Sequence, residues 1–283
     1  MTHQPVLLKE VISYLAPKSF GHYLDGTVGG GGHVQAILEA SAPAGVVLGL
    51  DRDPKVIKRL RQTLAKDQPR LHLAHRSYAD VAELLTELKW SDIDGALLDL
   101  GLSSLQLADA NRGMSFRLEG PLDLRFDQSR GLPATAHLAK WSAAKLANIL
   151  ETYGELSRGQ QLARRLKNFG PITTTYDLKV ASGLSHPRRL SQLFQALRIA
   201  TNCELGHLED GLAAIWSILR PGGRLVIISF QSLEDRLVKH FFSARAKEGA
   251  GSLLTKKVVI ATPEEQRTNP RSRSAKLRAI QKI

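Results

Sequence analysis

The first hundred residues alternate short apolar runs with amphipathic segments. The apolar runs have the length of buried strands, and they lie at residues 21–25, 45–51, 71–75 and 94–99. Helical periodicity marks the segments that follow the first three runs, at residues 34–40, 54–66 and 79–89. Alternation of this kind predicts a parallel sheet with right-handed crossovers. A ligand of such a sheet is expected at the carboxyl ends of the strands.

A long helical stretch interrupts this alternation. The next clear strand, at residues 224–230, begins more than 120 residues after the fourth one ends, although a strand–helix–strand unit needs only about 30 residues. Helical periodicity fills the interval, at residues 134–152, 155–168, 174–183, 189–201 and 204–219. We therefore predict an α/β, doubly wound fold whose sheet domain comprises residues 1–107 and 204–283, with an all-helical insert at residues 108–203.

The turn after the first strand contains four consecutive glycines. It reads Asp25-Gly-Thr-Val-Gly-Gly-Gly-Gly-His33, and Asp51 ends the second strand eighteen positions later. Glycines at a strand-to-helix turn let the backbone approach a ligand closely, with the amino end of the helix beside it. A carboxylate at the end of the second strand can accept two hydrogen bonds from a ribose diol. The alternative is a glycine-rich turn that binds no ligand.

The register of these glycines separates classes of cofactor. A dinucleotide-binding turn has the pattern G-x-G-x-x-G, but Val34 or Gln35 stands where its third glycine would be. A phosphate-binding P-loop needs Gly-Lys-Ser/Thr, and His33 follows the last glycine instead. The pattern therefore favours an adenosyl ligand without a pyrophosphate, which indicates S-adenosylmethionine.

Positive charge is concentrated in two segments of the chain. The net charge is +12. Residues 131–200 carry ten Lys/Arg and three Asp/Glu, a net of +7, and residues 267–283 carry six Lys/Arg and no acidic residue, a net of +6. Such clusters favour a polyphosphate partner such as a nucleic acid; solvated faces of a basic protein are the alternative. A last strand, expected at residues 275–283, places three basic side chains on one face: Lys276, Arg278 and Lys282.

Other features of the sequence bound its class. No apolar run is long enough to span a membrane, and residues 1–10 lack the charged, apolar and small-residue sections of a signal peptide. The single cysteine, Cys203, excludes an intramolecular disulfide and a cysteine cluster for a metal. We therefore expect a cytoplasmic protein without a metal site.

Three polar segments are candidates for chemistry. Residues 99–107 follow the fourth strand and would lie over the reactive end of a cofactor. Residues 112–127 mix arginine, carboxylates and phenylalanine with little periodicity, as functional loops often do. Residues 229–236 follow the fifth strand at the same edge of the sheet. For the first segment, an ordinary polar loop is the alternative.

In these motifs the chain resembles the bacterial 16S rRNA (cytosine-N4)-methyltransferase family. The resemblance extends over the full length. It rests on nine segments in order: His3–Glu10; Asp25–Thr27 with Gly31–His33; Leu98–Gly101 with Ser103, Ser104, Gln106 and Leu107; Gly120–Asp123; Tyr153–Glu155; Arg198 and Ile199 with Asn202, Glu204 and Leu205; Pro221–Leu225; Ser232–Arg236; and Asn269–Ser274.

The resemblance implies a class I methyltransferase sheet with an all-helical insert for RNA recognition. It also implies methylation of the N4 amine of a cytidine in the decoding region of 16S rRNA, within the small ribosomal subunit. The family's positions for S-adenosylmethionine correspond to Gly31, Gly32, His33, Asp51, Tyr78, Asp99 and Gln106. Relatives usually have His, Asp and Glu where this chain has Gln231, Ala108 and Leu156. A glutamine at position 231 can form a hydrogen bond but cannot transfer a proton.

The residues that act on the target amine are predicted by position. Many amine-directed nucleic-acid methyltransferases have an Asp/Asn/Ser-Pro-Pro-aromatic loop after the fourth strand, and this chain has none. The lone pair of a cytosine N4 is delocalised into the ring, so acceptors on its N–H groups would enrich it and take the proton. Asp99, Ser103 and Ser104 occupy the corresponding positions and are the predicted catalytic residues.

Two other functions remain open from the sequence alone. One is a nicotinamide-dependent oxidoreductase on a similar sheet, against which the missing third glycine argues. The other is a non-enzymatic RNA-binding or assembly factor that retains the methyltransferase fold, against which the intact glycine turn and Asp51 argue.

Overall fold

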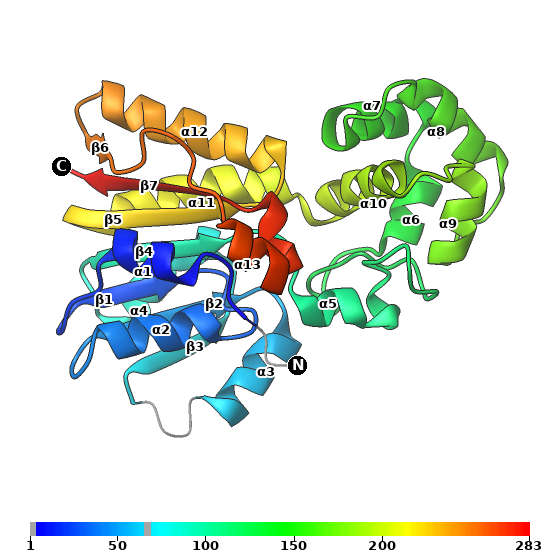
Figure 1. Ribbon diagram of the computed structural model, residues 1–283. Helices are drawn as coiled ribbons and strands as arrows, with labels where there is room; N and C mark the ends of the chain where they lie inside the picture. The colour runs from blue at the N-terminus through cyan, green and yellow to red at the C-terminus, as the bar shows by residue number, and fades with distance from the viewer. Residues whose placement is uncertain (1–3, 65–68) are drawn as a thin grey trace. The chain divides into compact units, whose positions relative to one another are not determined.

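The chain forms two compact units. The structure is a computed structural model that describes residues 4–64 and 69–283, and the side chain of Ser104 is also outside what it describes. The first unit comprises residues 1–101 and 206–283, and the second comprises residues 102–205 (Figure 1). The helical insert that the sequence places at residues 108–203 lies inside the second unit.

The first unit is built on a seven-stranded sheet in the order β3-β2-β1-β4-β5-β7-β6 (Figure 1). Strands β1 to β5 are parallel, and β7 is antiparallel to both β5 and β6. The strands are β1 His22–Asp25, β2 Val46–Asp51, β3 Leu71–His75, β4 Ile93–Asp99, β5 Leu219–Ser229, β6 Gly251–Leu253 and β7 Lys276–Lys282. The predicted parallel sheet and its last strand are therefore confirmed. The fifth strand begins earlier than predicted, with an irregular register against β4 between Ile93 and Gly95.

Helices cover both faces of this sheet because side chains alternate along each strand. Tyr23 and Leu97 belong to the core on one face, with α1 Leu8–Leu15, α2 Gly32–Ala40 and α3 Pro54–Thr63. Leu24 and Leu98, one residue further along, belong to the core on the other, with α4 Val81–Leu88, α11 Glu204–Ile218 and α12 Ser232–Lys247. Two buried faces leave the carboxyl ends of the strands as the place for a ligand.

The second unit is all-helical around one apolar core. Its elements are α5 Ser104–Ala108, η3 Ala110–Arg112, α6 Ala134–Lys140, α7 Ala143–Gly154, α8 Gly159–Asn168, α9 Thr175–Ser182 and α10 Pro187–Asn202. The prediction of a single helix at 134–152 is wrong, because this stretch forms the two helices α6 and α7. Trp141 between them is extended, and the Ser142 side chain caps α7 by accepting from Lys145 N. The helix predicted from residue 155 begins at Gly159, because Glu155 adopts a left-handed conformation at the end of α7.

Several elements were not predicted from the sequence pattern. Besides α1, α5 and β6, these are the helix α12 and, near the carboxyl terminus, α13 Pro263–Thr268 and η4 Pro270–Ser274. The helix predicted at 79–89 begins as the 3-10 turn η2 Tyr78–Asp80. The predicted end of the helix at 54–66 falls outside the described residues. Within the described part of the chain, no helix is long and apolar enough to cross a membrane.

The basic residues of β7 contact the protein itself. Lys276, Arg278 and Lys282 were expected on one face, and that face packs toward α11 and α12. Arg278 donates to the two carboxylate oxygens of Asp235 at 2.6 and 3.2 Å, and Lys276 Nζ lies 3.8 Å from the same carboxylate. Lys282 Nζ donates to the carbonyl oxygen of Trp216 at 2.8 Å. These charges fasten the antiparallel strand to the neighbouring helices.

Candidate active site

The glycine turn joins β1 to α2 at the carboxyl edge of the sheet. Gly29 and Gly31 have φ angles of 46° and 84°, in the left-handed region that favours glycine. A Cβ on Gly31 would lie 2.8 Å from a Leu60 methyl carbon, and one on Gly32 would lie 2.7 Å from Pro5 Cγ. The glycines are therefore required by the packing behind the turn as well as by any ligand in front of it.

Asp51 holds this turn against the end of β2. Its Oδ2 accepts from Gly29 N at 3.0 Å, and its Oδ1 accepts from Asp53 N at 2.8 Å. The carboxylate predicted to bind a ribose thus also orders the glycine turn. Both jobs favour an ionised acceptor at this position.

A buried group of ionisable side chains lies beside the turn. His33, in the first turn of α2, is 6% exposed and its Nε2 lies 3.6 Å from Asp99 Oδ2, at the end of β4. Asp25, at the end of β1, is 1% exposed, and its Oδ1 accepts from Thr27 N at 3.0 Å. Asp99 N donates to Thr27 Oγ1 at 2.7 Å, which fixes the two strand ends to each other.

Four polar atoms of this group have no hydrogen-bond partner among the described residues. They are Asp25 Oδ2, both ring nitrogens of His33 and Asp99 Oδ1. Buried polar atoms are nearly always paired in folded proteins, so their convergence indicates a place for a polar ligand. In the described part of the chain, no group of His, Cys, Asp or Glu side chains is arranged to hold a metal ion.

The same group has shifted pKa values. Burial raises the pKa of Asp25 to about 7, although His33 and the N–H of Thr27 act in the opposite direction. Burial alone would lower the pKa of His33, but Asp99 and Asp25 outweigh it and raise that pKa. Both shifts favour the protonated form, so the group holds more protons in the folded chain than its members would in water.

Tyr78 lies in the core beside the turn rather than in front of it. Its side chain is 8% exposed and belongs to the apolar cluster under α4 and α11. A Cβ on Gly211 would lie 2.2 Å from the Tyr78 ring, and one on Gly26 would lie 3.0 Å from Tyr78 Cβ. The ring is thus buried against two glycines.

The other predicted site residues belong to the helical unit. Ser103 and Gln106 form a capping box at the start of α5: Ser103 N donates to Gln106 Oε1 at 3.0 Å, and Gln106 N donates to Ser103 Oγ at 3.2 Å. Gln106 is 7% exposed. Ser104 is the first residue of α5. The structure shows how these residues are ordered within their own unit.

The irregular segment 112–127 is also held inside the helical unit. Arg112 is buried and donates from Nη1 to the carbonyl oxygen of Phe126 at 2.9 Å. Asn202 accepts from Phe126 N at 2.8 Å and donates to the carbonyl oxygen of Leu124 at 2.7 Å. Two further ion pairs reinforce this arrangement, Asp123 with Arg125 and Arg198 with Glu204. Polar and charged motif residues, which in the sequence are candidates for catalysis or binding, therefore hold this loop in place.

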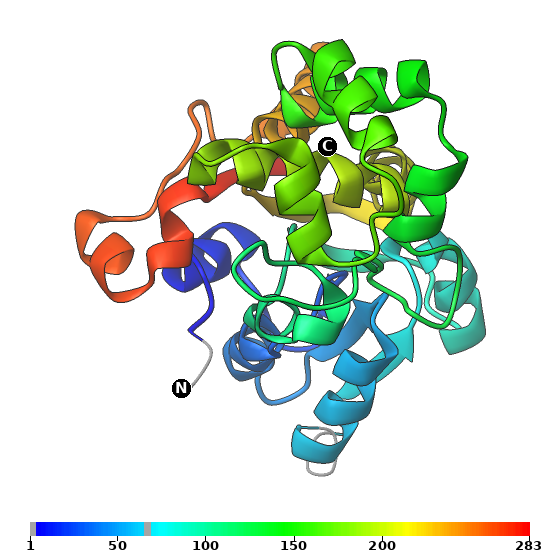
Figure 2. The same ribbon diagram turned by 90° about the vertical axis from the view of Figure 1, so that its right-hand side faces the viewer.

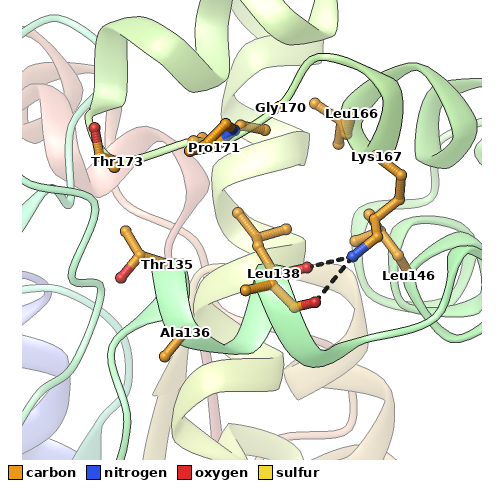
Figure 3. A pocket seen from close by; sticks show the side chains of 11 residues that line it. Thr135, Ala136, Leu138, Leu146, Leu166, Lys167, Gly170, Pro171 and Thr173 are labelled. Carbon is orange, nitrogen blue, oxygen red and sulfur yellow. Dashed lines mark hydrogen bonds between the residues drawn. The ribbon is translucent and has the colours of Figure 1, made fainter.

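A cavity of about 510 Å³ lies in the same unit (Figure 3). Its walls come from α6, α7, α8 and residues 170–173 and are mostly apolar. Lys167 Nζ donates to the carbonyl oxygens of Leu138 and Ala139 at 2.8 and 3.1 Å. None of the predicted site residues lines this cavity, so it is separate from the candidate active site.

The segment of α13 and η4 also lies near the candidate site, which the sequence did not predict. Glu265 Oε1 accepts from Leu7 N at 2.8 Å, and its charge acts on His33. Arg271 is half-buried; burial lowers its pKa, and the charge of Asp99 acts against that lowering. In the sequence this segment was visible as the family motif Asn269–Ser274 and as a basic cluster, and the basic cluster suggested contact with RNA.

Comparisons with known proteins agree with this geometry. The sequence profile of the MraW methylase family matches residues 1–283. The ribosomal RNA small subunit methyltransferase H of Thermomicrobium roseum is 45% identical over 100% of this chain and 94% of its own. The protein of the same name from Trichlorobacter lovleyi is 42% identical over 99% and 98%. A provisionally assigned methyltransferase from Streptococcus mutans, solved in complex with SAH, superposes with a TM-score of 0.50 over 100% of both chains at 11% identity.

The sheet order, the single antiparallel internal strand and the glycine turn define a class I methyltransferase. The chain belongs to the MraW methylase family. The predicted fold class and family resemblance are confirmed, and the chain is an enzyme that transfers a methyl group. This membership also decides against a nicotinamide-dependent oxidoreductase.

The raised pKa of Asp25 predicts how stability depends on pH. The folded chain favours a protonated Asp25, so this contribution is complete below about pH 4 and is lost as the pH rises through about 7. His33 acts in the same direction, because its pKa is also raised. Relative to wild type, an Asp25→Asn variant should gain up to about 4 kcal/mol in free energy of unfolding between pH 4 and pH 8. Urea unfolding of both proteins without ligand, across this range, measures the difference; parallel pH profiles would contradict the buried, protonated carboxyl.

Proposed function

We propose that this methyltransferase methylates the N4 amine of a cytidine in the decoding region of 16S rRNA, in the cytoplasm and within the small ribosomal subunit. The names of the relatives support ribosomal RNA of the small subunit as the substrate. The main support for this location of the active site is a group of buried polar atoms without hydrogen-bond partners. These atoms belong to Asp25, His33 and Asp99 beside the glycine turn. An assay of methyl transfer to small subunits tests the proposal against a purely binding role.

The methyl donor is S-adenosylmethionine, which supplies an activated methyl group on its sulfonium. The group fits the amino-acid end of this molecule: side-chain oxygens of Asp25 and Asp99 accept from an ammonium, and a protonated His33 donates to a carboxylate. Gly31 N donates to the Val28 carbonyl oxygen at 2.7 Å and so shapes the turn, and Gly32, the first residue of α2, brings the amino end of this helix to the ligand.

Asp51, Tyr78 and Gln106 are the remaining proposed cofactor residues. Asp51 accepts from the ribose while it orders Gly29. Tyr78, because it is buried, contributes a ring edge and the shape of the adenine side rather than a stacking face. Gln106, whose Oε1 accepts from Ser103 N in the cap of α5, is proposed as a cofactor residue from its place in the family motif.

The target amine needs acceptors more than a strong base. Asp99, Ser103 and Ser104 are the proposed catalytic residues, because acceptors on the N–H groups of N4 would localise its lone pair and take the proton after transfer. A hydroxyl such as that of Ser103 has a second lone pair in addition to the one that accepts from Gln106 N. The position of Asp99 beside the buried His33 supports a share in the cofactor site as well.

We propose that the helical unit is the main binding surface for rRNA. Most basic residues of segment 131–200 are exposed there: Lys140, Lys145, Arg158, Arg164, Arg165, Lys179, Arg188 and Arg189. In segment 267–283, by contrast, Lys276, Arg278 and Lys282 contact the protein, and Arg267 and Arg273 are the exposed basic residues. The C-terminal share in RNA binding is therefore smaller than the net charge suggests.

The ribose assignment predicts the effect of replacing Asp51. Charge-assisted hydrogen bonds contribute roughly 1.5–3 kcal/mol, so Asp51→Ala should weaken S-adenosylhomocysteine binding by about 10- to 150-fold. Because Asp51 also holds Gly29, calorimetry should include the 2′-deoxy analogue of the ligand. A ribose contact predicts a smaller loss for this analogue, whereas equal losses for both ligands would assign Asp51 to the turn alone. Asp51→Asn, which keeps an acceptor for Gly29 N, is the matched control.

The charge distribution predicts the salt dependence of RNA binding. Changing Lys145, Arg158, Arg164 and Lys179 to glutamine should weaken binding to 16S rRNA fragments and lower the slope of log K against log salt by up to about 0.7–0.9 for each phosphate that is no longer neutralised. A variant with the same change in charge on the first unit serves as the control, with glutamine at Lys58, Lys89, Lys239 and Lys247, all of which are exposed. Equal slopes in the two variants would place the RNA elsewhere.

The proposed chemistry predicts direct transfer without a covalent enzyme–base intermediate. Methylation at cytosine C5 would require a thiolate, and the single cysteine, Cys203, is an exposed residue at the end of α10. Cys203→Ser should keep its activity, whereas Asp99→Ala should lose most of it. The target base must be unpaired, because a paired N4 amine is already occupied. Mass spectrometry of the modified nucleoside decides the position, and a methyl group on carbon would refute the mechanism.

A further inference from the structure

The carboxyl-terminal segment is fastened to the amino-terminal one. Leu7 N donates to Glu265 Oε1 at 2.8 Å, and Asn269 Nδ2 donates to the carbonyl oxygen of Gln4 at 3.3 Å. Figure 2 shows the orange-red α13 and η4 beside the blue residues that lead into α1. Ser272 N donates to the Asn269 carbonyl oxygen at 2.9 Å, and Ser272 is fully buried. The backbone on both sides of Arg271 is therefore fixed.

The amino-terminal residues in turn cover the glycine turn. Pro5 packs so closely on Gly32 that a Cβ there would lie 2.7 Å from Pro5 Cγ. The three segments thus lie one against the next, the turn against residues 4–7 and these against residues 265–269. This arrangement brings η4, which carries the half-buried Arg271, toward the glycine turn, and the charge of Asp99 acts on the Arg271 guanidinium over this separation.

A guanidinium beside a carboxylate discriminates between ligands. Asp99 would repel a phosphodiester, which offers only negative charge. A zwitterion suits the pair, because its ammonium faces the carboxylate while its carboxylate faces the guanidinium. The unpaired ring nitrogens of His33 and the unpaired Oδ1 of Asp99, both buried, are the groups that such a ligand would satisfy.

We propose that Arg271, together with His33, binds the α-carboxylate of S-adenosylmethionine, while Asp99 accepts from its α-ammonium. This inference rests on the proposed function and adds to it a cofactor-binding residue from the far end of the chain. The segment of α13 and η4 is then a wall of the cofactor site, ordered by Glu265 and Asn269, rather than a part of the RNA surface.

Calorimetry with two ligands tests the role of Arg271. S-adenosylhomocysteine carries the α-carboxylate, and its decarboxylated analogue, S-adenosyl-3-thiopropylamine, does not. Loss of a charge-assisted pair predicts that Arg271→Met weakens binding of the first by about tenfold or more and binding of the second by less than about twofold. Arg273→Met, at an exposed arginine two residues along in η4, should bind both ligands as wild type does.

Other outcomes would overturn this inference in distinguishable ways. Equal losses for both ligands in Arg271→Met would show a role in folding of the segment only. If both ligands bind unchanged and 16S rRNA binds more weakly, Arg271 is a residue of the RNA-binding surface and not of the cofactor site. Failure of the wild-type chain to bind S-adenosylhomocysteine would instead refute the proposed function itself.

Discussion

The burial of His33 beside Asp99 is the interaction on which the site depends. His33 is buried and the Asp99 side chain is only 16% exposed, so both groups need polar partners, and the 3.6 Å between His33 Nε2 and Asp99 Oδ2 leaves part of that need unmet. The sheet makes this burial possible, because β1 and β4 are neighbours and end at the same edge with Asp25 and Asp99. Helix α2 then begins immediately behind the turn and carries His33 into the gap.

The same constraint explains why the glycine turn is so restricted. Leu60 approaches it from α3, and Pro5 covers it from the amino-terminal segment. Side chains on Gly31 or Gly32 would displace these neighbours and open the buried group to water. Asp51 completes the arrangement by holding Gly29 from the end of β2. Packing, rather than the ligand alone, thus accounts for glycine at these positions.

The polar residues of the family pattern serve two purposes. Those at the carboxyl edge of the sheet leave atoms unpaired, as a ligand site requires. Those in the helical unit are largely paired with one another, as Arg198 is with Glu204, and hold the irregular segment 112–127. A pattern of recurring polar residues does not separate these purposes, because both need buried polar groups. Only the hydrogen bonds that each group makes in the folded chain separate them.

The parallel sheet, the helical stretch after it, the class of cofactor and the family could all be predicted from the sequence. These predictions depend on local periodicity, on the register of a nine-residue turn and on the order of the motifs, all of which can be seen directly in the sequence. The tertiary structure fixed the features that depend on residues far apart in the sequence. It divided the helix predicted at 134–152, buried Tyr78 against Gly211, and paired Arg278 with Asp235. It also brought the segment that carries Arg271 toward the glycine turn, because the approach of the two ends of the chain depends on how three segments pack and not on any local pattern.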